Sequence, residues 1–135
     1  MRVLIIDGQG GKLGSMLVQL VRERYPMAEI IAVGTNAAAA AAMKKSGAQQ
    51  AASAENPVLV ACRRADVIIG PIGIVIADSL CGEITPKMAT AVGQASAVRI
   101  LLPVNRCENL VAGIQDLSIT SMLEDVAQKL ESIQE

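Results

Sequence analysis

Short apolar runs and amphipathic stretches alternate along the chain from one end to the other. The first run, residues 2–7, consists mainly of Val, Leu and Ile, as expected of a buried parallel strand. The stretch that follows, from about 12 to 24, places Leu13, Leu17 and Val21 on one face, which is helical spacing. This alternation indicates an α/β fold with a mostly parallel sheet.

The same patterns predict the remaining elements. Further strands are expected at 29–33, 48–52, 67–69 and 98–102, with 110–114 as a sixth. Further helices are expected at 37–45, 55–64, 85–94 and 118–133. We therefore predict a three-layer Rossmann-like domain, with a mostly parallel sheet of five or six strands and helices on both faces. No linker or repeat divides the chain, so residues 1–135 are expected to form a single domain.

The composition of the chain argues against some classes of partner. The net charge is −1, and Tyr25 is the single aromatic residue, so neither a basic patch nor stacking surfaces indicate nucleic acid. The longest apolar run, 67–77, contains glycines and is shorter than the roughly 20 residues that span a bilayer, so no membrane partner is expected. The hydrophobic content of 52% exceeds the usual share, which favours a homo-oligomer. Three scattered cysteines and the absence of a leader-like segment favour the cytoplasm.

Catalytic candidates are few. The chain has no His, so Cys81 and Cys107 lack the usual activating base, and we interpret both as buried or partly buried thiols. Glu83 could act as an acid or base, although a solvated glutamate is the simpler interpretation. Asn105 and Arg106 follow the fifth predicted strand, where they could contact a substrate or ribose, or serve as a turn residue and a surface cation. The catalytic residues, and whether there is a reaction at all, therefore stay open.

A glycine cluster lies between the first predicted strand and the first predicted helix. Gly8, Gly11 and Gly14 are spaced three apart, and Gly10 is an extra glycine. In a strand–turn–helix context this spacing is typical of a turn whose bare backbone amides hold a phosphate at the positive end of a helix. The alternative is a tight turn without a ligand. The predicted phosphate site comprises Gly8, Gln9, Gly10, Gly11, Lys12, Leu13 and Gly14.

Polar or small residues also follow the other predicted strands. Ligands of parallel sheets bind outside the carboxyl ends of the strands, so these residues are expected to complete the site. They are Gly34, Thr35, Asn36, Gly70, Pro71, Ile72, Gly73 and Asn105.

Two of the residues near the expected site are unusual for a nicotinamide site. The second strand lacks the terminal acid that binds the ribose of NAD, so Asn36 is read either as a ribose partner or as a helix N-cap. Asp7 would repel an anion. It could bind a ribose hydroxyl or Mg²⁺, or accept N–H groups of the loop, and the last of these is its simplest role. The cofactor is therefore NAD, NADP or another nucleotide, with the choice open.

Five segments carry a resemblance over nearly the whole chain. They are residues 7–11, 34–36, 68–74, 82–86 and 103–105. Together they resemble a small bacterial family known as domain of unknown function 3842. The resemblance implies a stand-alone Rossmann-like domain and supplies no catalytic residues. The glycine loop alone is similar to that of dihydrodipicolinate reductases and extended short-chain dehydrogenases, although those reductases have a further substrate domain that this chain lacks.

Three functions are consistent with these patterns. The first is an NAD(P)- or nucleotide-binding protein that holds a nucleotide or other phosphate-bearing small molecule on the Gly8–Gly14 loop. The second is a small oxidoreductase or other nucleotide-dependent enzyme whose active site is completed by a second subunit. The third is a structural or interaction protein without a ligand.

Overall fold

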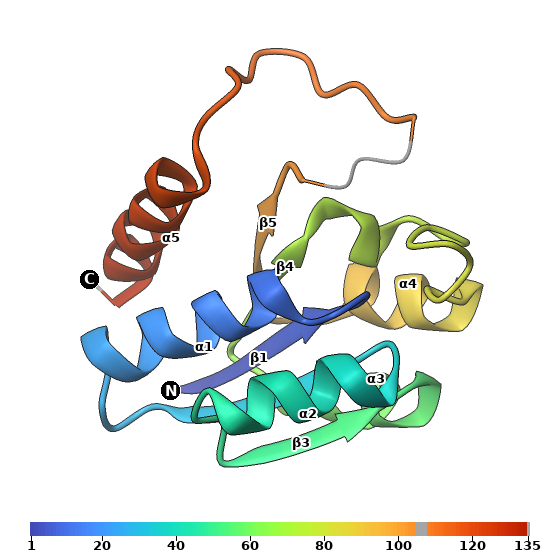
Figure 1. Cartoon of the computed structure of the whole chain (residues 1–135), viewed down its shortest axis with the longest axis horizontal. Helices are drawn as coiled ribbons and strands as arrows, with labels where there is room; N and C mark the ends of the chain where they lie inside the picture. Colours follow the sequence, from blue (N-terminus) through green and yellow to red (C-terminus); the bar gives the residue numbers. More distant parts are fainter. Residues whose placement is uncertain (105–107, 135) are drawn as a thin grey trace.

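Parallel strands form one sheet in the order β3-β2-β1-β4-β5 (Figure 1). The computed structural model describes residues 1–104 and 108–134. Its strands are β1 (Arg2–Asp7), β2 (Glu29–Gly34), β3 (Gln50–Ser53), β4 (Val67–Pro71) and β5 (Val98–Leu102). The chain adds strands on one side of β1 up to β3, then crosses to the other side of β1 for β4. This reversal between β1 and β4 is the topological switch point where ligands of such sheets bind.

Helices cover both faces of the sheet. They are α1 (Lys12–Arg24), α2 (Ala37–Lys45), α3 (Glu55–Cys62), the short 3-10 helix η1 (Ile72–Val75), α4 (Pro86–Gln94) and α5 (Ile119–Gln134). The two faces of β1 build two separate cores. Val3 and Ile5 pack with α1, α2 and α5, whereas Leu4 and Ile6 pack with α3 and α4. The predicted three-layer Rossmann-like fold is therefore confirmed.

The predicted sixth strand is wrong. Residues 110–114 form no strand, and residues 108–118 stand away from the sheet as an arch (Figure 1). Gly113 turns the chain with a φ of +81°, and Leu110 is 94% exposed. An apolar run becomes a strand only where a neighbouring edge pairs with it, and here none does among the described residues. Among the smaller differences, β3 begins at Gln50, β4 extends to Pro71 and α3 ends at Cys62.

No helix among the described residues is both long and apolar enough to cross a membrane.

Candidate functional site

The glycine turn joins β1 to α1 directly. Gly11 adopts the left-handed conformation, with φ +74°, and its N–H donates to the carbonyl oxygen of Gly8 at 2.9 Å. The carbonyl of Gly11 in turn accepts the N–H of Ser15 at 2.8 Å. Because a Cβ-bearing residue is strained at this φ, the turn requires glycine at position 11.

The other glycines of the turn differ in their surroundings. A Cβ added to Gly14 would overlap the sulfur of Met43 and lie 2.8 Å from the Cβ of Asp7, so this glycine lets α1 pack closely. A Cβ on Gly8 would lie 2.6 Å from the hydroxyl oxygen of Thr35. Nothing lies within 4 Å of the Cβ position of Gly10. Glycine is therefore required at positions 8 and 14 by close packing, whereas a Cβ at position 10 would meet no other residue.

Asp7 occupies two of the loop amides. The residue is 4% exposed, and Oδ1 accepts the N–H of Gly8 at 2.8 Å while Oδ2 accepts the N–H of Gly14 at 2.6 Å. Burial raises the pKa of Asp7, and the hydrogen bonds from Gly14 and Gly8 lower it in part. The structural role expected of Asp7 is confirmed, and its charge lies beside the space that a ligand would enter.

Four other amides of the turn have no acceptor among the described residues. These are the N–H groups of Gln9, Gly10, Lys12 and Leu13. Two of them, on Lys12 and Leu13, belong to the first turn of α1, where backbone donors have no partner within the helix. These four amides are therefore suited to bind an anion, and the positive end of α1 attracts a negative charge.

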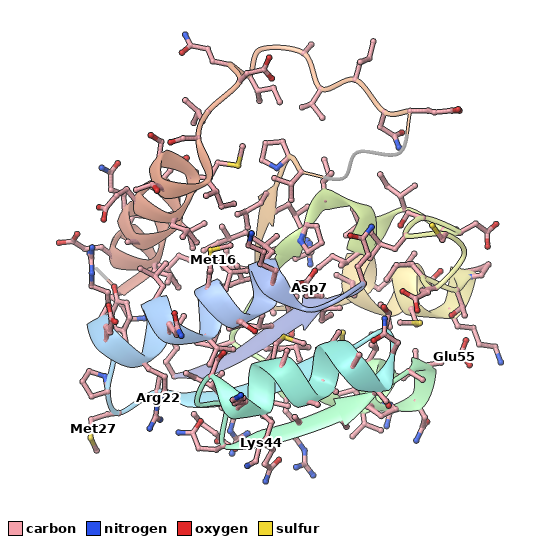
Figure 2. All side chains as sticks on the ribbon, in the orientation of Figure 1. Asp7, Met16, Arg22, Met27, Lys44 and Glu55 are labelled. Atoms are coloured by element: carbon pink, nitrogen blue, oxygen red, sulfur yellow. The ribbon has the colours of Figure 1, made fainter. Side chains whose placement is uncertain are left out.

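A cleft of about 320 Å³ opens beside these amides. It is lined by Asp7, Gly8, Gln9, Gly10, Gly11, Lys12, Leu13, Met16, Val104 and Ile119. The exposed Lys12 adds a positive charge, and Figure 2 shows Met16 on the side of α1 that faces away from α2. The site thus combines backbone donors and one ammonium group with an apolar wall.

Sequence reasoning missed the apolar wall. Met16 lies one helical turn after Lys12, so the predicted helix already placed both on one side of α1. Val104 follows β5, and Ile119 begins α5. Nothing in the sequence shows that α5 returns to the glycine turn, because that approach is set by packing against α1 and β5.

Several predicted site residues lie outside the cleft. Gly70 and Pro71 belong to β4, and Ile72 and Gly73 belong to η1. A Cβ on Gly70 would overlap the carbonyl oxygen of Ile6, and one on Gly73 would lie 2.9 Å from the hydroxyl oxygen of Ser79. These glycines are therefore accounted for by packing.

The predicted residues at the end of β2 are bound to another part of the chain. Gly34 packs against the start of α2, where a Cβ would overlap the backbone nitrogen of Ala40. Asn36 caps α2, since its side-chain oxygen accepts the N–H of Ala39 at 2.8 Å. The N-cap interpretation of Asn36 is thus confirmed.

Glu83 is not the solvated side chain that the sequence suggested. It is half-buried, and its Oε1 accepts the hydroxyl of Thr35 at 2.9 Å. The side-chain amide of Asn36 donates to its Oε2 at 3.1 Å and its Oε1 at 3.3 Å. The same amide donates to the carbonyl of Gln9 at 3.0 Å, which connects Glu83 to the glycine turn. Because these groups are almost fifty residues apart in the chain, no local pattern predicts their contact.

The cysteines differ in exposure. Cys81 is exposed, which corrects the expectation of a buried or partly buried thiol, and it lies in the turn at 78–82 with a φ of +56°. Cys62 is buried, and burial raises its pKa to about 11. Asn105, Arg106 and Cys107 lie outside the described residues. Within the part of the chain that is described, no group of three acidic, Cys or His side chains could hold a metal ion.

The chain matches one family model and is similar to a solved structure. The model of the family described as domain of unknown function (DUF3842) matches residues 2–135. No curated protein matches the chain. Among solved structures, the chain is similar to a dodecameric FMN-dependent UbiX-like decarboxylase from Escherichia coli O157:H7, with a TM-score of 0.44 and 19% identity. That similarity covers 97% of this chain and 76% of the other, and at this level it says nothing about a ligand or a reaction.

Proposed function

The chain belongs to the domain-of-unknown-function family 3842, and we propose that it binds a nucleotide or similar phosphate ester in the cleft at the glycine turn. The observation that carries the proposal is the set of amides on Gln9, Gly10, Lys12 and Leu13 that have no acceptor within residues 1–104 and 108–134. Unbonded backbone amides that lie around one cleft are suited to a phosphate, which offers several acceptor oxygens.

The charges near the cleft favour a phosphate that lies toward Lys12. Lys12 and the N-terminus of α1 attract an anion. The carboxylate of Asp7 repels one, but it is already bound by two amides and lies at the base of the turn. A phosphate placed over Gly10 and Lys12 gains the attraction and stays farthest from the Asp7 charge.

The apolar wall favours a ligand that carries a ring system. Met16, Val104 and Ile119 face the same cleft as the amides, so a phosphate on the amides leaves its ester group against these side chains. Cofactor sites typically combine such apolar surfaces with a few polar groups that fix orientation. The glycine spacing is typical of sites for NAD and NADP. The backbone amides of the turn would bind the phosphate of another nucleotide equally well.

A charge placed in the cleft wall tests the proposal. Met16→Glu should weaken binding of sulfate and of nucleotides at least about tenfold, because a desolvated like charge close to the phosphate costs more than about 1.4 kcal/mol. Gln19→Glu is the matched control, since it adds the same charge to the exposed side of α1 outside the cleft. Isothermal titration calorimetry measures both.

Mass spectrometry of the small molecules released by denaturing the purified protein would identify a natural ligand. Absence of binding by sulfate and by every nucleotide at millimolar concentration contradicts the proposal. Equal affinities of the two variants would place the ligand elsewhere.

We also propose that two copies of the chain associate through the β5 edge, which gives the expected homo-oligomer a location. Apolar side chains are exposed around this edge strand, with Val98 47% and Leu117 44% exposed. Antiparallel pairing centred on Ile100 places Arg99 opposite Leu101 of the second copy, so like charges do not meet.

Val98→Lys should give a monomer in light scattering, since lysine blocks edge pairing, whereas Met27→Lys, an exposed control far from β5, should not. A monomeric unmodified protein would contradict this arrangement.

The cytoplasm is the location that we propose, because Cys62 and Cys81 are free thiols.

A further inference from the structure

The carboxylate of Glu83 lies against the two side chains that follow β2, Thr35 and Asn36, on the side of the glycine turn toward which a dinucleotide-binding domain directs its ribose. In such domains an acid at the end of the second strand binds the ribose 2′-hydroxyl. Here the second strand is followed by Thr35 and Asn36, whose side chains are the groups available for a ribose. Both donate instead to Glu83, at 2.9 Å and 3.1 Å.

Glu83 is fixed in this position by its own segment. Its neighbour Ile84 and nearby Leu80 are 1% and 2% exposed, so both anchor the segment in the core beneath α4. The backbone N–H of Glu83 donates to the carbonyl of Leu80 at 3.0 Å, and the N–H of Ile84 donates to the carbonyl of Ser79 at 3.2 Å. The hydroxyl of Ser79 donates to the carbonyl of Gly73, which ties the segment to η1. The carboxylate is therefore built into the fold, so displacing it would cost packing as well as hydrogen bonds.

Side chains of Thr35, Leu80 and Glu83 pack closely around Gly8 on the β2 side of the glycine turn. A Cβ at Gly8 would lie 2.6 Å from Thr35 Oγ1, 3.0 Å from a methyl of Leu80 and 3.5 Å from Glu83 Oε1. A ligand that extends from the turn toward β2 would meet this carboxylate. Its charge would also repel the 2′-phosphate of NADP.

The opposite side of the turn is open. The 320 Å³ cleft lies between the turn, Met16, Val104 and Ile119, and its volume is at the lower end of the range for ligand sites, about 300–1,000 Å³. It offers one set of phosphate donors and one apolar wall. This fits one phosphate and one ring system.

We infer that Glu83, through its contacts with Thr35 and Asn36, excludes the second half of a dinucleotide, so that the site takes a phosphate monoester of mononucleotide size. The inference rests on the proposed function, because it assigns the ligand class of the same cleft. Glu83, Thr35 and Asn36 therefore do not fit NAD or NADP bound with a ribose at the end of the second strand.

The test compares dinucleotides with their own halves. AMP, nicotinamide mononucleotide and FMN are titrated by calorimetry against the unmodified protein, together with NAD and FAD, which contain them. We expect at least one mononucleotide to bind about tenfold or more tightly than the dinucleotide that contains it, because the dinucleotide must break hydrogen bonds of Glu83. Glu83→Ala should reduce the ratio of mononucleotide affinity to dinucleotide affinity. Glu23→Ala is the control, because it removes an exposed acid of α1 outside the cleft, and it should leave this ratio unchanged.

Each result bears on a different claim. A dinucleotide that binds as tightly as its halves overturns the exclusion by Glu83 and leaves the nucleotide site standing. Failure of sulfate and every nucleotide to bind overturns the proposed function, and the inference with it. If Glu83→Ala does not fold by circular dichroism, the ratio in the unmodified protein decides by itself.

Discussion

The backbone N–H of Gly14 donates to the carboxylate of Asp7 at 2.6 Å, which ties the first turn of α1 to the end of β1. The same approach brings the Cβ position of Gly14 to 2.8 Å from the Cβ of Asp7. Strand, turn and helix therefore form one rigid unit around a buried carboxylate. Several properties of the protein should depend on it.

The close approach at position 14 should make glycine necessary there for stability. Gly14→Ala should lower the free energy of unfolding by about 1–3 kcal/mol, because the added methyl overlaps the sulfur of Met43. Gly10→Ala is the control, since nothing lies within 4 Å of its Cβ position, and we expect a change within about 0.5 kcal/mol. Urea denaturation measures both. Similar losses for the two variants would contradict the close packing at position 14.

Titration of Asp7 should make both stability and anion binding depend on pH. Since burial raises its pKa in the folded protein, the folded state takes up a proton at higher pH than the unfolded chain does. The resulting stabilisation is complete below the unfolded pKa and is lost as the pH rises through the raised folded pKa. Sulfate keeps its charge in this range and should bind more tightly below the folded pKa, where Asp7 is neutral.

NMR titration of the Asp7 carboxyl carbon, alongside sulfate titrations at several pH values, measures this linkage. Asp7→Asn removes the titrating group, so its sulfate affinity should not change over the same window. An Asp7 pKa at or below its ordinary value would contradict the dominance of burial.

The two described thiols should react very differently. Burial raises the pKa of Cys62 to about 11, so its thiol stays protonated and shielded at pH 8, whereas Cys81 is exposed. Iodoacetamide at pH 8 followed by peptide mass spectrometry should label Cys81 in the native protein and Cys62 only after unfolding. Equal native labelling of both would mean that the α3 side of the core opens readily.

Ala54 should be a site where glycine stabilises the protein. It precedes α3 with φ 76° and ψ −164°, a region that residues with a Cβ adopt only at a cost of about 1–3 kcal/mol. Ala54→Gly should therefore raise the free energy of unfolding by about 1 kcal/mol, after the larger backbone entropy of glycine is subtracted. The same change at the exposed helical Ala41 should lower it by about 1 kcal/mol. Thermal unfolding distinguishes the opposite signs, and a loss at both positions would contradict the strain at Ala54.

Local features of the sequence determined the strands, the helices and the glycine turn. β1 and α1 follow from their apolar spacing, and the turn follows from Gly8, Gly11 and Gly14 between them. Asn36 caps α2, which is one of the two roles expected of it, and Thr85 caps α4, because a cap involves only residues three positions away. The predicted role of Asp7 also holds, since its partners lie within seven residues.

Tertiary structure alone decided what surrounds the turn. Glu83 reaches Thr35 and Asn36 only because the segment after β4 folds over the ends of β1 and β2, a contact between residues far apart in the chain. The apolar run at 110–114 is not a strand, because a strand needs hydrogen bonds from a neighbouring chain segment and not only apolar residues. The cleft depends on α5 packing against α1, which brings Ile119 beside Lys12. Spacing along the chain fixes local backbone geometry, whereas the packing of separate elements fixes which side chains meet.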